Sequence, residues 1–135
     1  MRLTDEERTA IVQLRLGRAK NTYAEVSILI GNGLWQTAAN RLYYACYYAV
    51  GALLVQNGIE AQTHQGTINQ LGLYFVRTGL LSAEQGKFYK QLFELCQTSD
   101  YSDWINIGEN DVNPFFEKAE DFINTVEQLI VSGRS

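Results

Sequence analysis

The most informative stretch of this sequence is Leu34-WQTAANRLYYACYYAVGALLV-Gln56, in which Arg41 is the only charged residue. Asn57-Gly58 follows it as a helix stop signal. A helix that is apolar on nearly every side is stable only when other elements cover it. The stretch therefore predicts a central helix inside a helical domain.

Helical periodicity continues on both sides of this stretch. Before it, Thr4 and Glu7 form a capping box that opens a helix ending at Gly31-Asn32-Gly33. After it, Ser82 and Gln85 form a second capping pair. Apolar residues recur at helical spacing over 67–78, 83–97 and about 110–131. No strand pattern rivals them, so the sequence predicts an all-α, up-and-down antiparallel bundle of about five helices.

Residues 99–108 interrupt this pattern, because Asp, Ser, Asn and Gly occur there without a period. We expect a loop there, with Trp104 and Ile105 as apolar anchors. Pro114 is expected in the first turn of the last helix, where its missing N–H costs least. A long loop among short connections is a place to look for function.

Length and composition limit the class of protein. A chain of 135 residues with 46% hydrophobic residues favours a single domain, residues 1–135, around one core. The apolar runs are shorter than the ~20 residues of a membrane span. Charges occupy Met1–Ala10, where a signal peptide would be apolar. We therefore expect a cytoplasmic protein that does not enter a membrane.

The chain offers little for a metal or a cofactor. Two cysteines and one histidine predict neither a disulfide framework nor a four-ligand zinc site. Phosphate-binding glycine loops, HExxH and CxxC pairs are absent from the sequence. No metal and no cofactor is expected.

The net charge of −4 is unevenly distributed along the chain. Residues 82–135 carry four Lys/Arg against ten Asp/Glu, whereas the rest of the chain is nearly balanced. Non-specific nucleic-acid binding depends on clustered Lys and Arg. Any role in binding nucleic acid would therefore have to be local and specific.

The tyrosine-rich part of the central helix is the first candidate site. Helical spacing pairs Tyr43 with Tyr47 and Tyr44 with Tyr48. These rings can be core residues with local hydrogen-bond partners, or a wall for a ligand with Arg41 as its anion contact. Because an unpaired charge on such a helix is costly, we expect Arg41 to have a partner or a pocket.

Three further residues could carry chemistry. His64, the only histidine, lies in the turn that leads into the third helix, and it is either a helix-capping group or a catalyst. Asp100 at a helix C-terminus opposes the helix dipole, so we expect it to bond something specific, such as Arg41 or a backbone donor. Cys96 is expected to be buried and unreactive.

The order and spacing of many residues resemble the HEPN domain family over most of the chain. The resemblance is carried by Gly33-Leu-Trp-x-x-Ala38-x-Asn40-Arg41-Leu-Tyr-Tyr44-Ala-Cys-Tyr-Tyr-Ala49, Ala52-Leu-Leu54, Gly58, Thr63-His64-x-Gly66, Phe75-Val-x-Thr-Gly79 and Asp100-Tyr101. It implies a helical bundle that is commonly a homodimer. It also implies a genomic partner, a minimal nucleotidyltransferase, in a toxin–antitoxin or related pair.

Two departures from the family's pattern argue against catalysis. Many members are metal-independent ribonucleases with an Arg followed four to six residues later by a His, whereas His64 follows Arg41 by twenty-three residues. Closely similar members place an Arg four residues before the Asp-Tyr pair, and Cys96 stands there in this chain. A thiol cannot replace a five-donor cation. We therefore expect binding rather than enzymatic activity.

Three functions remain open from the sequence. The first is a non-catalytic module that binds a nucleotide or an RNA end near Arg41, Tyr44, His64, Asp100 and Tyr101. The second is an active ribonuclease toxin that uses Arg41 and His64. The third is a structural partner of a nucleotidyltransferase, which could modify Tyr101 with a nucleotide.

Overall fold

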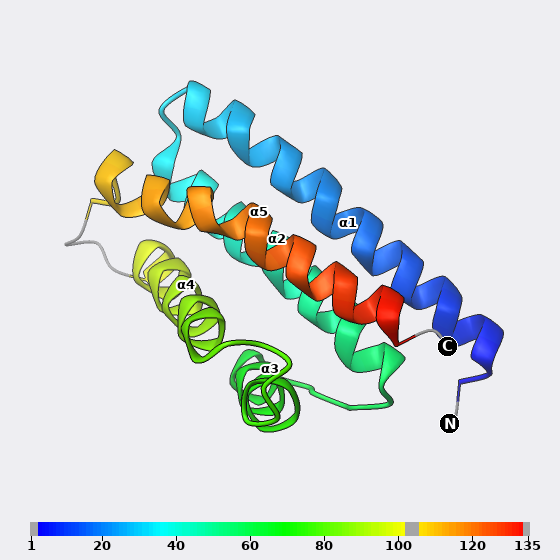
Figure 1. Ribbon diagram of the computed structural model, residues 1–135. Coiled ribbons are helices and arrows are strands. Elements are labelled where there is room, and N and C mark those ends of the chain that lie inside the picture. Colours follow the sequence, from blue (N-terminus) through cyan, green and yellow to red (C-terminus); the bar gives the residue numbers. More distant parts are fainter. Residues whose placement is uncertain (1–2, 102–105, 134–135) are drawn as a thin grey trace.

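The fold was analysed in a computed structural model that describes residues 3–101 and 106–133, with the side chains of 99–101 excepted. Over these residues the chain forms five α-helices and one short π-helix, and no strand (Figure 1). The elements are α1 (Asp5–Gly31), α2 (Trp35–Gln56), α3 (His64–Leu71), η1 (Gly72–Val76), α4 (Ala83–Tyr101) and α5 (Glu109–Ser132). The predicted all-α bundle is confirmed.

The first two helices form an antiparallel pair. The predicted capping box opens α1: Thr4 Oγ1 accepts from Glu7 N at 3.1 Å, and Glu7 Oε1 accepts from Thr4 N at 2.9 Å. These bonds lower the pKa of Glu7. Gly33 has a φ of 70°, which a glycine adopts without strain, and it turns the chain from α1 into α2.

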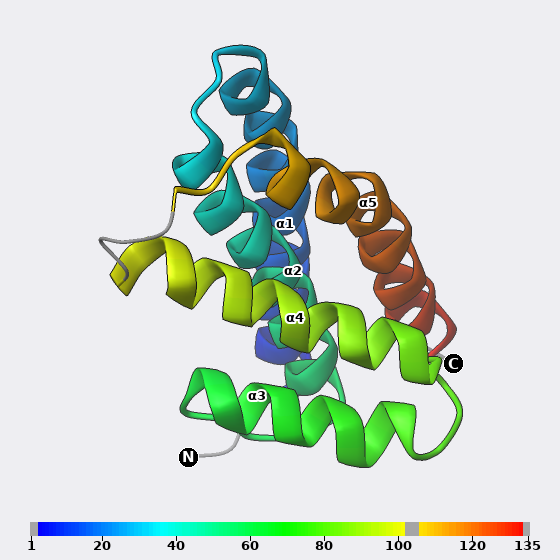
Figure 2. The same cartoon turned by 90° about the vertical axis from the view of Figure 1, so that its left-hand side faces the viewer.

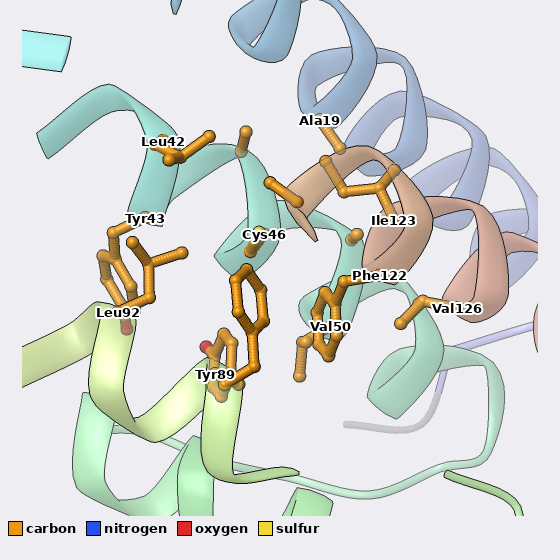
Figure 3. Packing of buried hydrophobic residues seen from close by; sticks show 14 of the residues in the cluster. Ala19, Leu42, Tyr43, Cys46, Val50, Tyr89, Leu92, Phe122, Ile123 and Val126 are labelled. Carbon is orange, nitrogen blue, oxygen red and sulfur yellow. The ribbon is translucent and has the colours of Figure 1, made fainter. Parts of the chain in front are cut away.

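Helix α2 lies at the centre of the molecule, as its composition predicts. Helices α1 and α5 flank it, and α4 crosses it (Figures 1 and 2). Figure 3 shows Cys46 and Val50 of α2 among Ala19 of α1 and Phe122 of α5. All four side chains are at most 1% exposed, so α2 holds the other helices together through its apolar surface.

The second half of the chain departs from a simple alternation of directions. Segment α3–η1 and helix α4 form an antiparallel pair that lies across α2 (Figure 2). This pair stands between α2 and α5 in the chain and returns it to the end of the molecule at which α2 begins. Helix α5 therefore runs beside α2 in the same direction (Figures 1 and 2).

The third helical segment begins earlier than the predicted 67–78. Thr63 caps α3, so that His64 is its first residue. The helix then widens into η1, where Arg77 N donates to Gly72 O at 2.9 Å across five residues. Gly79, with a φ of 83°, ends the segment as predicted.

Two other boundaries correct the sequence predictions. Helix α4 extends to Tyr101, so the predicted 99–108 loop is shorter, and Trp104 and Ile105 lie outside the described residues. Helix α5 begins at Glu109, which puts Pro114 in its second turn and not its first. The earlier start follows from Asp111, whose Oδ2 accepts from Gly108 N at 2.9 Å.

No helix in the described part of the chain has the length and apolar character of a membrane span.

Candidate functional site

The histidine and a buried tyrosine form the shortest link between α2 and α3. Tyr43 Oη and His64 Nδ1 are 2.7 Å apart, and Tyr43 is 1% exposed. Burial raises the pKa of Tyr43, which keeps its hydroxyl protonated. The Tyr43 hydroxyl and His64 Nδ1 therefore share one hydrogen bond, whose direction depends on the tautomer of the imidazole.

The start of α3 is built to present His64 at this point. Thr63 Oγ1 accepts from Gly66 N at 2.8 Å as the helix cap. A Cβ at position 66 would lie only 2.9 Å from that oxygen, so glycine lets the cap close. The helix cap formed by Thr63 and Gly66 thus fixes the position at which the imidazole of His64 enters the bundle.

Four aromatic rings surround the imidazole. Its centroid lies 4.8 Å from Tyr47, 5.5 Å from Tyr43, 5.6 Å from Phe93 and 5.9 Å from Tyr44. We call these four rings and His64 the aromatic cluster. The predicted Tyr43–Tyr47 and Tyr44–Tyr48 ring pairs are also present, at 5.8 and 6.1 Å. The imidazole is held in one orientation by contacts on several sides.

The arginine of α2 lies at one edge of the aromatic cluster. Arg41 Cζ stands 5.3 Å from the Tyr44 ring centroid in a cation–π contact. Its buried Nε has no hydrogen-bond partner among the described residues. Tyr44 therefore contacts both Arg41 and His64, and the structure brings these three predicted residues together.

The other two predicted residues stand at the end of α4. Asp100 and Tyr101 are in its last turn, but their side chains lie outside those described, as does the expected bond from Asp100 to Arg41. Cys96, one turn earlier, is 5% exposed, as expected for a buried thiol. Asn40 Nδ2 lies 3.7 Å from Cys96 Sγ, so this turn of α4 packs against α2 beside Arg41.

Two members of the aromatic cluster, Tyr43 and Phe93, are not recognisable from the sequence as partners of His64. Helical spacing pairs Tyr43 only with Tyr47, and no motif marks Phe93. Helical spacing identifies neighbours on one helix, whereas the Tyr43–His64 bond joins residues 21 apart on two helices. No local signal in the sequence marks such a contact.

The described side chains offer no metal site, since nowhere among them do three His, Cys, Asp or Glu residues gather closely enough to hold an ion.

Helix α2 is buried and carries an arginine at its tyrosine-rich surface, and the short capped helix α3 presents a histidine to that surface. This arrangement defines a class of all-helical protein with a polar site between α2 and α3. The chain matches the HEPN domain model over residues 12–129 and belongs to the HEPN family. It is 35% identical over 124 residues to a UPF0332 protein of Thermotoga maritima, covering 92% of this chain and 94% of the relative.

Two archaeal relatives extend this similarity. A UPF0332 protein of Archaeoglobus fulgidus is 24% identical over 123 residues, which cover 91% of this chain and 98% of the relative. The protein of Methanocaldococcus jannaschii named "Putative toxin MJ0142" is 26% identical over 104 residues, covering 77% of this chain and 71% of that protein. The family therefore includes a relative with a toxin name.

Proposed function

We propose that this HEPN protein is a cytoplasmic, non-catalytic component of a toxin–antitoxin-type system and holds a nucleotide or an RNA end. Its site would be Arg41, Tyr44, His64, Asp100 and Tyr101. The observation that carries the proposal is the buried Arg41 Nε without a described partner, in an arginine stacked on Tyr44. A guanidinium with donors to spare beside an aromatic ring suits a phosphate next to a base.

The residues available support the non-catalytic part of this proposal. The family's Arg-x4–6-His pattern is not present in the sequence, and Cys96 stands where similar members place an arginine. His64 Nδ1 is engaged by Tyr43, which leaves Nε2 as the ring nitrogen that can meet a ligand. These residues favour binding over strand cleavage.

A titration followed by NMR tests this proposal. We expect ATP, GTP or a short RNA to shift the signals of Arg41, Tyr44, His64 and Tyr101. Arg41→Gln should weaken binding about tenfold, because charge-assisted hydrogen bonds contribute about 1.5–3 kcal/mol. Arg77→Gln is the matched control, since it removes the same charge from an exposed position. No shift at millimolar ligand would contradict the proposal.

An active ribonuclease is the second candidate, because Arg41 and His64 contact the same Tyr44 ring. An arginine can stabilise a phosphorane and a histidine can move a proton. Incubation of the purified protein with RNA distinguishes the two functions. We expect intact RNA, whereas cleavage that disappears in His64→Ala would favour the ribonuclease and overturn the non-catalytic proposal.

We further propose that the protein is a homodimer and that its partner is a minimal nucleotidyltransferase. The support is the family resemblance and the acidic character of residues 82–135, which suits a basic partner surface. Co-expression with the neighbouring gene and affinity purification test the pair, and mass spectrometry shows whether Tyr101 gains a nucleotide. Recovery of this protein alone in every preparation would count against the partnership.

A further inference from the structure

A polar cleft is lined in part by Tyr47 and does not include Arg41. It has a volume of about 450 Å³ and is formed by α1, the second half of α2 and residues 59–67. Its polar wall holds Arg15 and Arg18 of α1, and Tyr47 and Tyr48 of α2 stand beside them. The volume is within the roughly 300–1,000 Å³ of small-ligand sites.

The two arginines of this cleft are not neutralised by the protein. In the part of the chain that the structure describes, the one ion pair joins Lys20 and Glu127, on another side of α1. Glu60 lines the cleft but is not within ion-pair distance of either arginine. Like charges three or four residues apart on a helix repel each other, so this arrangement costs stability unless a counter-charge binds.

The glycines of α2 and the following turn make room for the arginines. Arg15 Nη1 donates to Gly51 O at 3.3 Å, and a Cβ at position 51 would lie 3.4 Å from the same nitrogen. Arg8, two turns earlier on α1, lies near Gly58, where a Cβ would be 3.7 Å from Arg8 Nη1. Its buried Nε has no hydrogen-bond partner among the described residues. Positive charge thus follows the α1–α2 seam.

The cleft also has an apolar and aromatic part, beside the polar side chains of Glu60, Gln62 and Thr67. Leu54, Val55 and Ile59 line it together with Tyr47 and Tyr48. A ligand that fits must combine a negative charge with a flat apolar body. A nucleotide does so, because its phosphate matches a guanidinium and its base packs on aromatic and aliphatic side chains.

We propose that this cleft is a second site for a nucleotide unit, either free or within single-stranded RNA. Arg15 and Arg18 hold its phosphate, and Tyr48 with the apolar wall receives its base. Tyr47 lines the cleft and also contacts His64, so the two sites are neighbours along α2. This inference does not rest on the proposed function, since Arg41 takes no part in the cleft.

Titration of the full chain with AMP and with a short single-stranded RNA tests the cleft. We expect shifts at Tyr48 and Gly51, and a binding constant weakened about tenfold in Arg18→Gln. Arg18 is exposed, so its replacement leaves the fold intact. Arg77→Gln is the control of equal charge, and Glu60→Gln should strengthen binding because it removes the cleft's negative charge.

The outcomes separate the two sites and the two ligand sources. Shifts with AMP indicate a free nucleotide, and shifts with RNA alone indicate a strand segment; both support the cleft. Equal binding by Arg18→Gln and Arg77→Gln would overturn it, as would the absence of shifts at Tyr48 and Gly51 with both ligands. Binding weakened by Arg41→Gln but not by Arg18→Gln would leave the proposed function standing and remove this one.

Discussion

Two buried tyrosines, Tyr43 and Tyr89, reach into the same part of the core from α2 and α4 (Figure 3). Their ring centroids are 5.8 Å apart. The Tyr43 hydroxyl bonds His64, whereas the Tyr89 hydroxyl lies near Tyr43 but meets no described partner in hydrogen-bond geometry. A buried hydroxyl without a partner pays its desolvation cost in full.

Tyr43→Phe should therefore destabilise the protein, whereas Tyr89→Phe should not. Tyr43→Phe leaves His64 Nδ1 without its partner and is expected to cost about 1–2 kcal/mol. Tyr89→Phe removes a lone buried hydroxyl and should be neutral or stabilise by about 1 kcal/mol. Urea denaturation at pH 7 measures both values, with the exposed Tyr74→Phe as the control. Equal losses in both core variants would contradict this assignment.

At the scale of elements, two glycines show how packing changes the effect of one substitution. Gly86 of α4 faces η1, and a Cβ there would lie 2.8 Å from Val76 Cγ2. Gly17 of α1 is exposed, with nothing within 4 Å of a built Cβ. Helix propensity favours alanine equally at both positions, so any difference between them reports the contact with η1.

We expect Gly17→Ala to stabilise the protein by about 0.5–1 kcal/mol and Gly86→Ala to destabilise it by about 1–3 kcal/mol. Val76 cannot easily turn away, because a β-branched side chain in a helix is stiff. Adding Val76→Ala to Gly86→Ala should restore part of the loss in thermal denaturation. A loss that is unchanged in the double variant would show that η1 and α4 do not meet here as described.

The elements also show how far sequence reasoning reaches. Caps and periodicity predicted α1, α2 and the bonds of Thr4 and Ser82, because these depend on residues at most one turn apart. The π-helical turn after Leu71 was not predicted, since it depends on how that segment packs against α4. For the candidate site, the sequence predicts Arg41, Tyr44 and His64 as ligand-binding residues, and these three lie together in the structure, whereas the arginine cleft was not predicted. Arg15 meets Gly51 only after α1 folds back on α2.

At the scale of the whole molecule, burial raises the pKa of Tyr43, Tyr89 and Cys46. All three groups are neutral in the folded protein and ionise more readily once it unfolds. Their ordinary values are 10.0 for tyrosine and 9.0 for cysteine. The associated stability is fully present below those values and is lost as the pH rises above them, because the unfolded chain then releases protons that the folded chain keeps.

The protein should therefore be sensitive to alkali. Each of the three groups is expected to remove up to about 1.4 kcal/mol of unfolding free energy per pH unit above its ordinary pKa. Urea denaturation at pH 8, 9, 10 and 11 measures the slope. Tyr89→Phe should make it shallower above pH 10, whereas Tyr74→Phe should leave it unchanged. A flat profile from pH 8 to 11 would contradict this expectation.

Cys46 is a free cysteine at the centre of the bundle, and 0% of its surface is exposed. A thiol reagent can reach it only when the helices around α2 separate, and it then modifies the protein irreversibly. The rate at which the reagent labels Cys46 in the absence of denaturant therefore measures how often the core opens in the native protein. Cys46 and Arg41 lie in the same helix, α2. A ligand that binds at Arg41 and stabilises the native state should therefore also slow the labelling of Cys46.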